Sequence, residues 1–304
     1  MEVAITGASG LIGSALTRSL RDDGHTVLSL VRPASTGQRA ADAIRWDPVA
    51  GTIEADELEG IDAVVHLAGA GIGDKRWSPA RKREILESRT RGTDLLARTL
   101  AGLSRRPSVF VSGSAVGYYG DRGDEVLTEQ SPPGADFLAG VVRAWEAAAQ
   151  PAVHAGIRTV FLRNGVVLSG RGGILPRLVA PFRFFVGGRM GSGRQWLSWV
   201  SIDDEVRVIR FVFDRSDLSG PVNVTAPSPV TNAQLTAALG AALHRPTVVP
   251  VPALGPRLVL GREMADELLF VSQRAVPSAL TAAGYDFVHP DVATALRAVL
   301  GSRS

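Results

Sequence analysis

The sequence predicts an α/β fold, a doubly wound and mainly parallel sheet, with a smaller C-terminal lobe on the substrate side. A glycine loop joins the first apolar run to an amphipathic helix, and strand patterns then alternate with helical patterns through the first part of the chain. Small residues follow the expected strand ends. Alternation of this kind favours a parallel sheet, because right-handed crossovers place the connecting helices on its faces.

The first element is a glycine-rich turn between a strand and a helix. A short apolar strand ends at Thr6, and an amphipathic run follows over residues 11–20. Gly7 permits a sharp turn, Gly10 leaves room for a pyrophosphate against the backbone, and Gly13 permits close packing of helix on strand. Amide groups at the start of a helix favour an anion. The loop therefore predicts a dinucleotide site, with a purely structural turn as the alternative; the expected contacts are Gly7, Ser9, Gly10, Leu11, Ile12 and Gly13.

The end of the second strand, expected over residues 24–31, indicates which dinucleotide binds. An acidic side chain there would accept hydrogen bonds from the ribose of NAD, whereas an arginine can pair with the 2′-phosphate of NADP. Arg32 directly follows Val31, and the next acidic residue, Asp42, lies in the following loop. We therefore predict NADP(H) as the cofactor, with Val31 and Arg32 among its contacts. The alternative for Arg32 is a solvated surface arginine.

Later strands and helices continue the alternation. We expect strands over 61–70, 108–114 and 158–163, and helices over 88–103 and 145–153. The carboxyl ends of these strands would form one crevice, where an open α/β sheet binds its ligands. The cofactor contacts expected at these strand tips are Leu67, Ala68, Gly69, Ser112 and Val166.

Composition allows an ordinary enzyme and excludes several kinds of site. The 304 residues are 45% apolar, enough for a substantial core, and include no cysteine, which excludes disulfides and thiolate chemistry. A net charge of +3 with scattered arginines gives no support for a nucleic-acid partner. Neither clustered histidines nor spaced carboxylates indicate a metal site. Without an apolar leader or a run of about twenty apolar residues, a cytoplasmic protein with no membrane segment is expected.

The regular pattern changes after residue 170. A glycine- and arginine-rich stretch extends to residue 193, and the last third of the chain mixes short strands with helices. We predict an NADP-binding domain over 1–225, with a substrate-side insertion near 170–200, and a C-terminal α/β lobe over 226–304.

Several motifs resemble those of the extended short-chain dehydrogenases/reductases. They are Thr6-Gly-x-x-Gly10-x-x-Gly13, His66-Leu67-Ala68-Gly69, Ser112-Gly113-Ser114-Ala115 followed by Tyr119-Gly120, and Trp199-Val200-Ser201-Ile202-Asp203-Asp204. Segments such as 75–77, 84–89 and 191–196 resemble the "epimerase family protein" branch more narrowly. That branch pairs an NAD-dependent epimerase/dehydratase-like domain with a C-terminal domain of unknown function. The resemblance implies a Rossmann-type fold and NADP(H) binding.

The chain departs from this family at the proton-transfer pair. Extended members carry Tyr-x-x-x-Lys on the helix after the serine strand, where the lysine lowers the tyrosine pKa from about 10. The expected helix over 137–146 contains neither residue type. The resemblance implies a catalytic role for Ser114, with Ser112 as an alternative and a serine satisfied by the backbone as the other interpretation. Tyr118 is the nearest phenol and the second catalytic candidate, although residues 117–121 have turn composition.

Further candidates surround the same crevice. Arg89 stands where the wider family has a cofactor-side asparagine, so the resemblance implies cofactor contacts for Arg89 and the nearby Glu84. The alternative for Arg89 is a surface ion pair with Glu87. Arg194 is similar in placement to the anion-binding arginine of many nucleotide-sugar enzymes, and Trp196 beside it can stack on a ring.

These candidates also have structural interpretations. A solvated arginine and core tryptophans are the alternatives for Arg194 and Trp196, and His66 is expected to be a packed strand residue rather than a base. Two functions follow: an NADP(H)-dependent oxidoreductase or epimerase acting on a small polar, anionic substrate, or a non-catalytic NADP(H)-binding regulator. The sequence indicates neither the substrate nor the oligomeric state.

Overall fold

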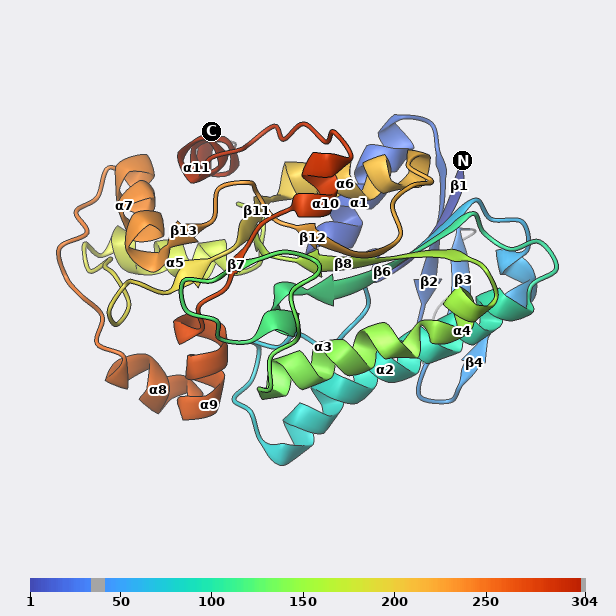
Figure 1. Cartoon of the computed structure of the whole chain (residues 1–304), viewed down its shortest axis with the longest axis horizontal. Helices are drawn as coiled ribbons and strands as arrows, with labels where there is room; N and C mark the ends of the chain where they lie inside the picture. Colours follow the sequence, from blue (N-terminus) through green and yellow to red (C-terminus); the bar gives the residue numbers. More distant parts are fainter. Residues whose placement is uncertain (34–41, 302–304) are drawn as a thin grey trace.

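A central sheet of eight strands organises the protein (Figure 1). The computed structural model describes residues 1–33 and 42–301. The sheet strands in spatial order are β12 (Gly220–Val224), β8 (Arg158–Asn164), β6 (Val109–Ala115), β5 (Ala63–His66), β1 (Glu2–Thr6), β2 (Thr26–Val31), β3 (Ala43–Asp47) and β4 (Thr52–Ile53). All neighbours are parallel except β3 and β4. Because the chain leaves β1 in both directions, the sheet is doubly wound, as predicted.

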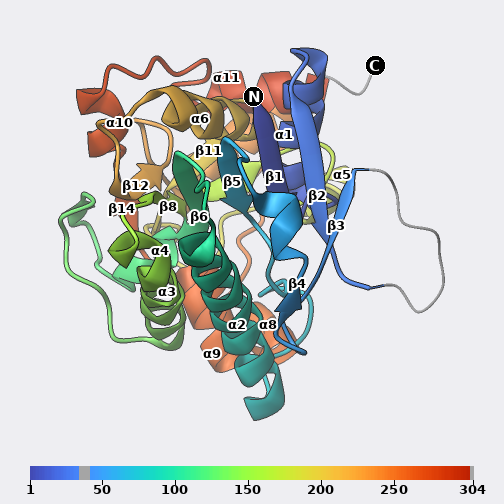
Figure 2. The same ribbon diagram turned by 90° about the vertical axis from the view of Figure 1, so that its right-hand side faces the viewer.

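Helices cover both faces of the sheet (Figures 1 and 2). On one face α1 (Leu11–Asp22), α6 (Ile202–Asp214) and α10 (Ser278–Ala282) enclose a core formed by alternate strand residues such as Val109 and Val111. On the other face α2 (Pro79–Gly102) and α4 (Gln150–His154) pack with the intervening Phe110, and α3 (Phe137–Ala148) contacts α2 and β6. Strand side chains alternate between faces, so even-numbered positions of β6 face α3. None of the helices described here is long and apolar enough to cross a bilayer.

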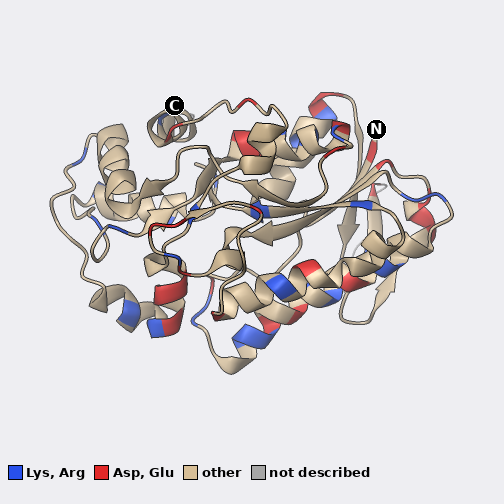
Figure 3. Ribbon diagram, in the orientation of Figure 1, with Lys and Arg blue, Asp and Glu red and all other residues tan. Residues whose placement is uncertain are grey.

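Capping residues explain where the helices begin and end. Ser78 accepts from the Arg81 amide and Pro79 occupies the first turn, so α2 begins nine residues before the predicted start at 88. Along α2, positive and negative side chains are interspersed (Figure 3) and include the Arg91–Glu87 and Arg98–Asp94 pairs. The single helix predicted over 145–153 is wrong, because the chain breaks between α3 and α4, where Pro151 lacks an amide hydrogen.

A second group of short elements lies beyond the carboxyl ends of the strands. It contains η2 (Val116–Tyr119), β7 (Val126–Leu127), β9 (Val166–Leu168), α5 (Leu175–Arg183), β10 (Trp196–Leu197), β11 (Trp199–Ser201), β13 (Val230–Thr231), α7 (Asn232–Leu243), α8 (Leu254–Leu260), α9 (Arg262–Ala265), η3 (Asp266–Phe270), β14 (Arg274–Ala275) and α11 (Val292–Gly301). Trp199 of β11, Val179 of α5 and Leu239 of α7 share one core. The predicted insertion and the predicted C-terminal lobe therefore pack together, and the domain boundary at 225 stays a prediction.

Candidate functional site

The loop between β1 and α1 has the geometry of a phosphate cradle. Gly7 adopts φ +69°, and a Cβ atom on Gly13 would lie 2.2 Å from the Gly7 carbonyl oxygen, so both positions require glycine. Gly10 is exposed and has more room. Among the described atoms, a Cβ on Gly10 would meet only the Gly7 carbonyl oxygen, at 3.2 Å. The helix starts at Gly10 without a side-chain cap and has no acidic residue in its first turn. The amides of Leu11 and Ile12 at this helix start fit an anion.

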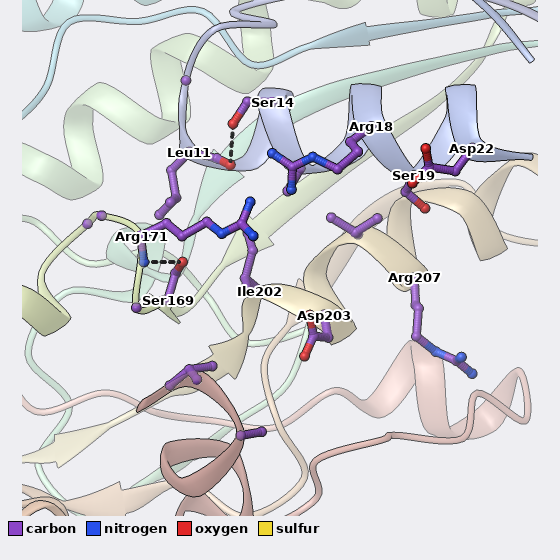
Figure 4. Close-up of a pocket in the computed structure, with 18 of the residues that line it drawn as sticks. Leu11, Ser14, Arg18, Ser19, Asp22, Ser169, Arg171, Ile202, Asp203 and Arg207 are labelled. Carbon is purple, nitrogen blue, oxygen red and sulfur yellow. Dashed lines mark hydrogen bonds between the residues drawn. The ribbon is translucent and has the colours of Figure 1, made fainter. Parts of the chain in front are cut away.

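A groove of about 850 Å³ begins at this loop and follows α1 (Figure 4). Ser14 and Arg18 of α1 line one side, Asp203 and Arg207 of α6 line the other, and the loop around Arg171 lies at one end. Ser9 and Gly10 are part of its lining, whereas Ser114 and Tyr118 are not. The groove therefore meets the phosphate cradle from the side of the sheet opposite to α3.

The end of β2 carries the predicted cofactor-selecting residue. Val31, the last residue of β2, is 40% exposed, and Arg32 after it is exposed. An exposed guanidinium in this position can pair with a phosphate. Residues 34–41, which follow in the chain, lie outside its described part.

Hydrogen bonds of the Thr6 hydroxyl join the end of β1 to the end of β5. The Thr6 hydroxyl oxygen accepts from the amides of Leu67 and Ala68 at 3.1 and 3.2 Å, so its own hydrogen is left for Nδ1 of His66 at 2.7 Å. His66 is fully buried, and burial together with the charge of Arg89 lowers its pKa to about 4. The packed interpretation of His66 is therefore right. Gly69, just beyond, is exposed at the crevice.

Arg89 lies beside this tip, and its described hydrogen bonds go to backbone carbonyl oxygens. Its Nη1 donates to the carbonyl oxygens of Ala70 and Ile85 at 3.0 and 3.1 Å, and its guanidinium lies 5.1 Å from the Trp145 ring centroid. Burial, with the nearby charge of Arg81, lowers the pKa of Arg89 to about 10, so it is still cationic at neutral pH. The alternative interpretation of Arg89, a surface ion pair with Glu87, is wrong, because Glu87 pairs with Arg91.

The two carboxylates near Arg89 have other partners, because Arg91 and Arg81 lie closer to them. Glu87 pairs with Arg91 at 3.1 Å, and Glu84 pairs with Arg81 at 2.7 Å. Arg81 is 8% exposed, and it also donates to the Gly71 carbonyl oxygen. Glu84 is thereby held near the loop after β5, while its role as a cofactor contact stays a prediction.

Ser114 belongs to a buried polar cluster between β6, β8 and α3. Its Oγ donates to Oε1 of Glu146 on α3 at 2.6 Å, and Arg163 of β8 binds both oxygens of the same carboxylate, Nε–Oε1 at 2.9 Å and Nη2–Oε2 at 3.0 Å. Ser114 and Arg163 are register partners. Ser112, two residues earlier on the same face, is fully buried and donates only to the Gly113 carbonyl oxygen, at 3.3 Å.

Arg163 also fixes the two tyrosines of η2. Its guanidinium lies 3.5 Å from the Tyr118 ring centroid, and Nη1 donates to the Tyr119 hydroxyl at 3.1 Å. Tyr119 donates in turn to Oδ1 of Asn223 on β12 at 2.6 Å and is fully buried, whereas Tyr118 is half-buried. Of the two phenols, Tyr118 is therefore the one that can reach a ligand.

The substrate-side candidates lie on the strand and loop around β10. Trp196 is half-buried, donates from Nε1 to Asp124 at 2.7 Å, and has the Arg274 guanidinium 4.2 Å from its ring centroid. Arg194 is exposed, and its amide donates to the Ser192 hydroxyl. By contrast Trp199, which pairs in register with Val166, is fully buried, as the core interpretation predicts.

One unpredicted acid lies under the tip of β8. Glu205, in the first turn of α6, is fully buried and its Oε2 has no described partner. Asn164 donates from its amide nitrogen to Oε1 of Glu205 at 3.2 Å. Burial raises the pKa of Glu205 to about 8, so the carboxyl is protonated at neutral pH. An acid in a helix's first turn is usually exposed, so the sequence carried no signal of this burial.

Comparison with known proteins decides the family. Residues 3–225 match the model of the NAD dependent epimerase/dehydratase family, and residues 251–299 match a domain of unknown function, DUF1731. The chain belongs to the NAD dependent epimerase/dehydratase family. An epimerase family protein of Mycobacterium tuberculosis is 45% identical, over 97% of this chain and 96% of that protein. The human epimerase family protein SDR39U1 is 35% identical, over 99% of this chain and 100% of its own.

Solved structures agree with this assignment. A crystal structure of human SDR39U1 (isoform 2) with NADPH superimposes with a TM-score of 0.89 at 33% identity, covering 99% of each chain. A nucleoside-diphosphate sugar epimerase from Corynebacterium glutamicum gives a TM-score of 0.81 at 40% identity, covering 99% of this chain and 58% of that one. The predicted family and the predicted Rossmann-type fold are confirmed.

Proposed function

We propose that this chain binds NADP(H) and acts as an oxidoreductase or epimerase-like enzyme on a small polar substrate. The observation that carries the proposal is the glycine cradle, where Gly10 is open at an uncapped helix start and Gly7 and Gly13 have no room for a side chain. The human relative's structure with NADPH supports the choice of cofactor.

Residues at three places would hold the cofactor. The amides around Leu11 would bind the pyrophosphate, Arg32 the 2′-phosphate, and the tips of β5 and β8, at Ala68 and Val166, the nicotinamide end. Arg89, a cation whose described hydrogen bonds go to backbone carbonyl oxygens, adds attraction for an anion at the crevice. When bound, the nicotinamide supplies or accepts a hydride.

The chain's own groups would handle the substrate. Ser114 and Tyr118 lie on consecutive elements, β6 and η2, and both contact the Arg163–Glu146 pair. Ser114 donates a hydrogen bond to Glu146, and the Tyr118 ring lies against the Arg163 guanidinium. A hydroxyl and a phenol fixed in this way can orient a substrate oxygen and exchange a proton with it. Arg194 would attract an anionic group of the substrate.

A second function, a non-catalytic NADP(H)-binding regulator, is favoured by one observation. The helix α3, where the family resemblance expects Tyr-x-x-x-Lys, contains neither residue type. Such a protein would bind the cofactor and catalyse no reaction, and cofactor binding would change the conformation of its surface.

Hydride transfer distinguishes the two functions. NADPH deuterated on the nicotinamide is incubated with mixtures of small sugars, keto acids and aldehydes, and products are searched for deuterium by mass spectrometry. The enzyme proposal expects labelled product with wild type and none with Ser114→Ala, although both bind NADPH. Tight NADPH binding with label that stays in the cofactor across all mixtures, and with no epimerised sugar among the products, would favour the regulator.

A further inference from the structure

The Ser114 hydroxyl donates its one hydrogen to a carboxylate, that of Glu146. A serine hydroxyl has one hydrogen and two lone pairs, and an ionised carboxylate only accepts. At 2.6 Å from Oε1 of Glu146, Ser114 must therefore be the donor, and the lone pairs of its Oγ are what remain for a ligand.

Arg163 holds the carboxylate of Glu146 by two hydrogen bonds. Two guanidinium nitrogens bind the two oxygens of the carboxylate, and the side chains of Arg163 and Glu146 are 4% and 14% exposed. Burial disfavours the charge on Arg163, but the hydrogen bonds and charge of Glu146 outweigh it and hold the pKa of Arg163 above its ordinary value. A paired carboxylate of this kind is an acceptor at neutral pH.

Glu146 occupies the helix from which the family's usual pair is missing. Ser114 and Arg163 face α3 from neighbouring strands, and Glu146 in the third turn of α3 lies across both. We propose that Glu146, held by Arg163, orients Ser114 as a hydrogen-bond acceptor and receives a proton through it, so that the site takes the hydroxyl form of its substrate. This inference rests on the proposed enzymatic function.

The proton balance of the step is simple. The substrate O–H bond breaks, its proton bonds to Ser114 Oγ, and the original Ser114 proton moves to Oε1 of Glu146. The carboxylate becomes a neutral acid, and the electron pair of the broken bond forms the carbonyl bond of the product while the adjacent carbon loses hydride to the oxidised nicotinamide of the proposed function. Ser114 touches the substrate, whereas Glu146 is a positioning residue and the end point of the proton.

The first test needs no ligand. Glutamate labelled with carbon-13 at the carboxyl is incorporated, and the Glu146 signal is identified by its loss in Glu146→Gln. We expect this signal at the position of a carboxylate at about pH 7 and displaced in Ser114→Ala, which removes the donor. A protonated Glu146 at neutral pH would overturn the inference, because a protonated carboxyl could donate to Ser114.

The second test compares hydroxyl and carbonyl forms of the same compound. Lactate with pyruvate, and glycerol phosphate with dihydroxyacetone phosphate, are titrated by ligand-observed NMR with oxidised NADP saturating. The wild type is expected to prefer the hydroxyl member about fivefold, from one hydrogen bond. In Glu146→Gln the amide can donate to Ser114 and free its hydrogen, so the preference is expected to vanish or reverse, and Glu146→Asp is expected to retain part of it.

Glu129→Gln is the matched control, since Glu129 is another buried carboxylate, bound to the amides of Asn223 and Ala279 rather than to Ser114. Its hydroxyl preference should match that of the wild type. A hydroxyl preference unchanged in Glu146→Gln, or a carbonyl preference in the wild type, would overturn the inference. NADP affinity is measured on every sample: a wild type that fails to bind the cofactor defeats the proposed function, whereas normal cofactor binding with the wrong preference defeats only this inference.

Discussion

Ser114 and Arg163 donate to the same oxygen atom, Oε1 of Glu146, from neighbouring strands of the sheet. The arrangement joins the β6 tip, the β8 strand and α3 through one carboxylate. Arg163 extends it to Tyr118 by stacking and to Tyr119 by a hydrogen bond. The serine that the family resemblance selects is thus part of a buried ionic cluster, and both the stability and the chemistry of the site depend on it.

Arg163→Met should destabilise the fold by about 3 kcal/mol, because it leaves the Glu146 carboxylate buried and unpaired. Urea unfolding followed by circular dichroism measures the change. Arg98→Met is the matched control: its Asp94 partner lies one helical turn away and the arginine is 68% exposed, so a change of about 0.5 kcal/mol or less is expected. Equal effects of the two substitutions would contradict the assigned role of Arg163.

The glycine loop gives a second prediction. Gly10→Val should abolish NADPH binding, because the branched side chain fills the space where the backbone would approach the pyrophosphate. The chain should stay folded, since Gly10 has φ −73°, which valine tolerates. Fluorescence titration and circular dichroism on the same sample test both points. Gly255→Val, at an exposed position with open space around it, should bind NADPH normally; retained binding in Gly10→Val would mean that the loop does not hold the phosphates.

Cofactor preference provides the third prediction. The wild type should bind NADPH at least about tenfold more tightly than NADH, about 1.4 kcal/mol, and Arg32→Ala should remove most of this difference. Arg297→Ala removes another exposed guanidinium, on α11, and should leave the ratio unchanged. Equal wild-type affinities for the two cofactors would show that Arg32 does not select the 2′-phosphate.

Local sequence was sufficient to predict much of this fold and part of the site. The glycine loop and the strand–helix alternation are local patterns, so the cradle at Gly10 and the parallel sheet were predictable. The short edge strands β3 and β4 were missed, because they form only through pairing with each other and with the rest of the sheet. The break between α3 and α4 was missed, because it depends on one residue, Pro151, which lacks an amide hydrogen.

The carboxylate partner of Ser114 was also missed, for a different reason. Glu146 and Arg163 lie 17 residues apart in the chain and meet only through the register of β6 with β8 and the packing of α3. A glutamate in a helical pattern is most often a solvated residue, so nothing in the sequence distinguishes Glu146 from its exposed counterparts. The same applies to Glu205, whose burial depends on how α6 packs under β8.

Glu205 makes stability depend on pH. Its pKa is raised to about 8 in the folded chain, above the ordinary value of 4.5, so between these values the folded state binds a proton that the unfolded state has lost. Stability should fall as pH rises through this range, by about 1.4 kcal/mol per unit and about 5 kcal/mol in total. Glu205→Gln keeps an amide that Asn164 can contact and removes this loss.

Urea unfolding at about pH 5, 7 and 9 tests the prediction. The free energy of unfolding of Glu205→Gln, minus that of the wild type, should grow as pH rises to about 8, the folded-state pKa of Glu205, and then level off. Glu2→Gln, an exposed carboxylate, should show a constant difference. A constant difference for Glu205→Gln as well would show that the buried carboxyl does not titrate in this range.

Arg194 gives the last prediction, on the substrate side. The residue is exposed beside Gly193, which has φ +70°, and its loop is anchored by Gln195, whose amide nitrogen donates to the carbonyl oxygens of Met190 and Leu269. A guanidinium presented from an anchored loop can bind a phosphate or carboxylate with two parallel hydrogen bonds, which a lysine cannot reproduce. We therefore expect Arg194→Lys to weaken an anionic ligand about tenfold, about 1.4 kcal/mol, and Arg194→Ala to weaken it further, with NADPH affinity unchanged in both.

Thermal-shift screening of phosphorylated sugars and small carboxylates, with NADPH saturating, supplies the ligand for this comparison. Arg189→Lys is the matched control, since that arginine lies in the same loop but its Nη1 donates to the Ser192 carbonyl oxygen, so it should bind the ligand as the wild type does. A ligand from the screen that binds Arg194→Ala as tightly as the wild type would remove Arg194 from the substrate site. Loss of binding in Arg189→Lys to the same degree as in Arg194→Lys would instead assign the effect to the conformation of the loop.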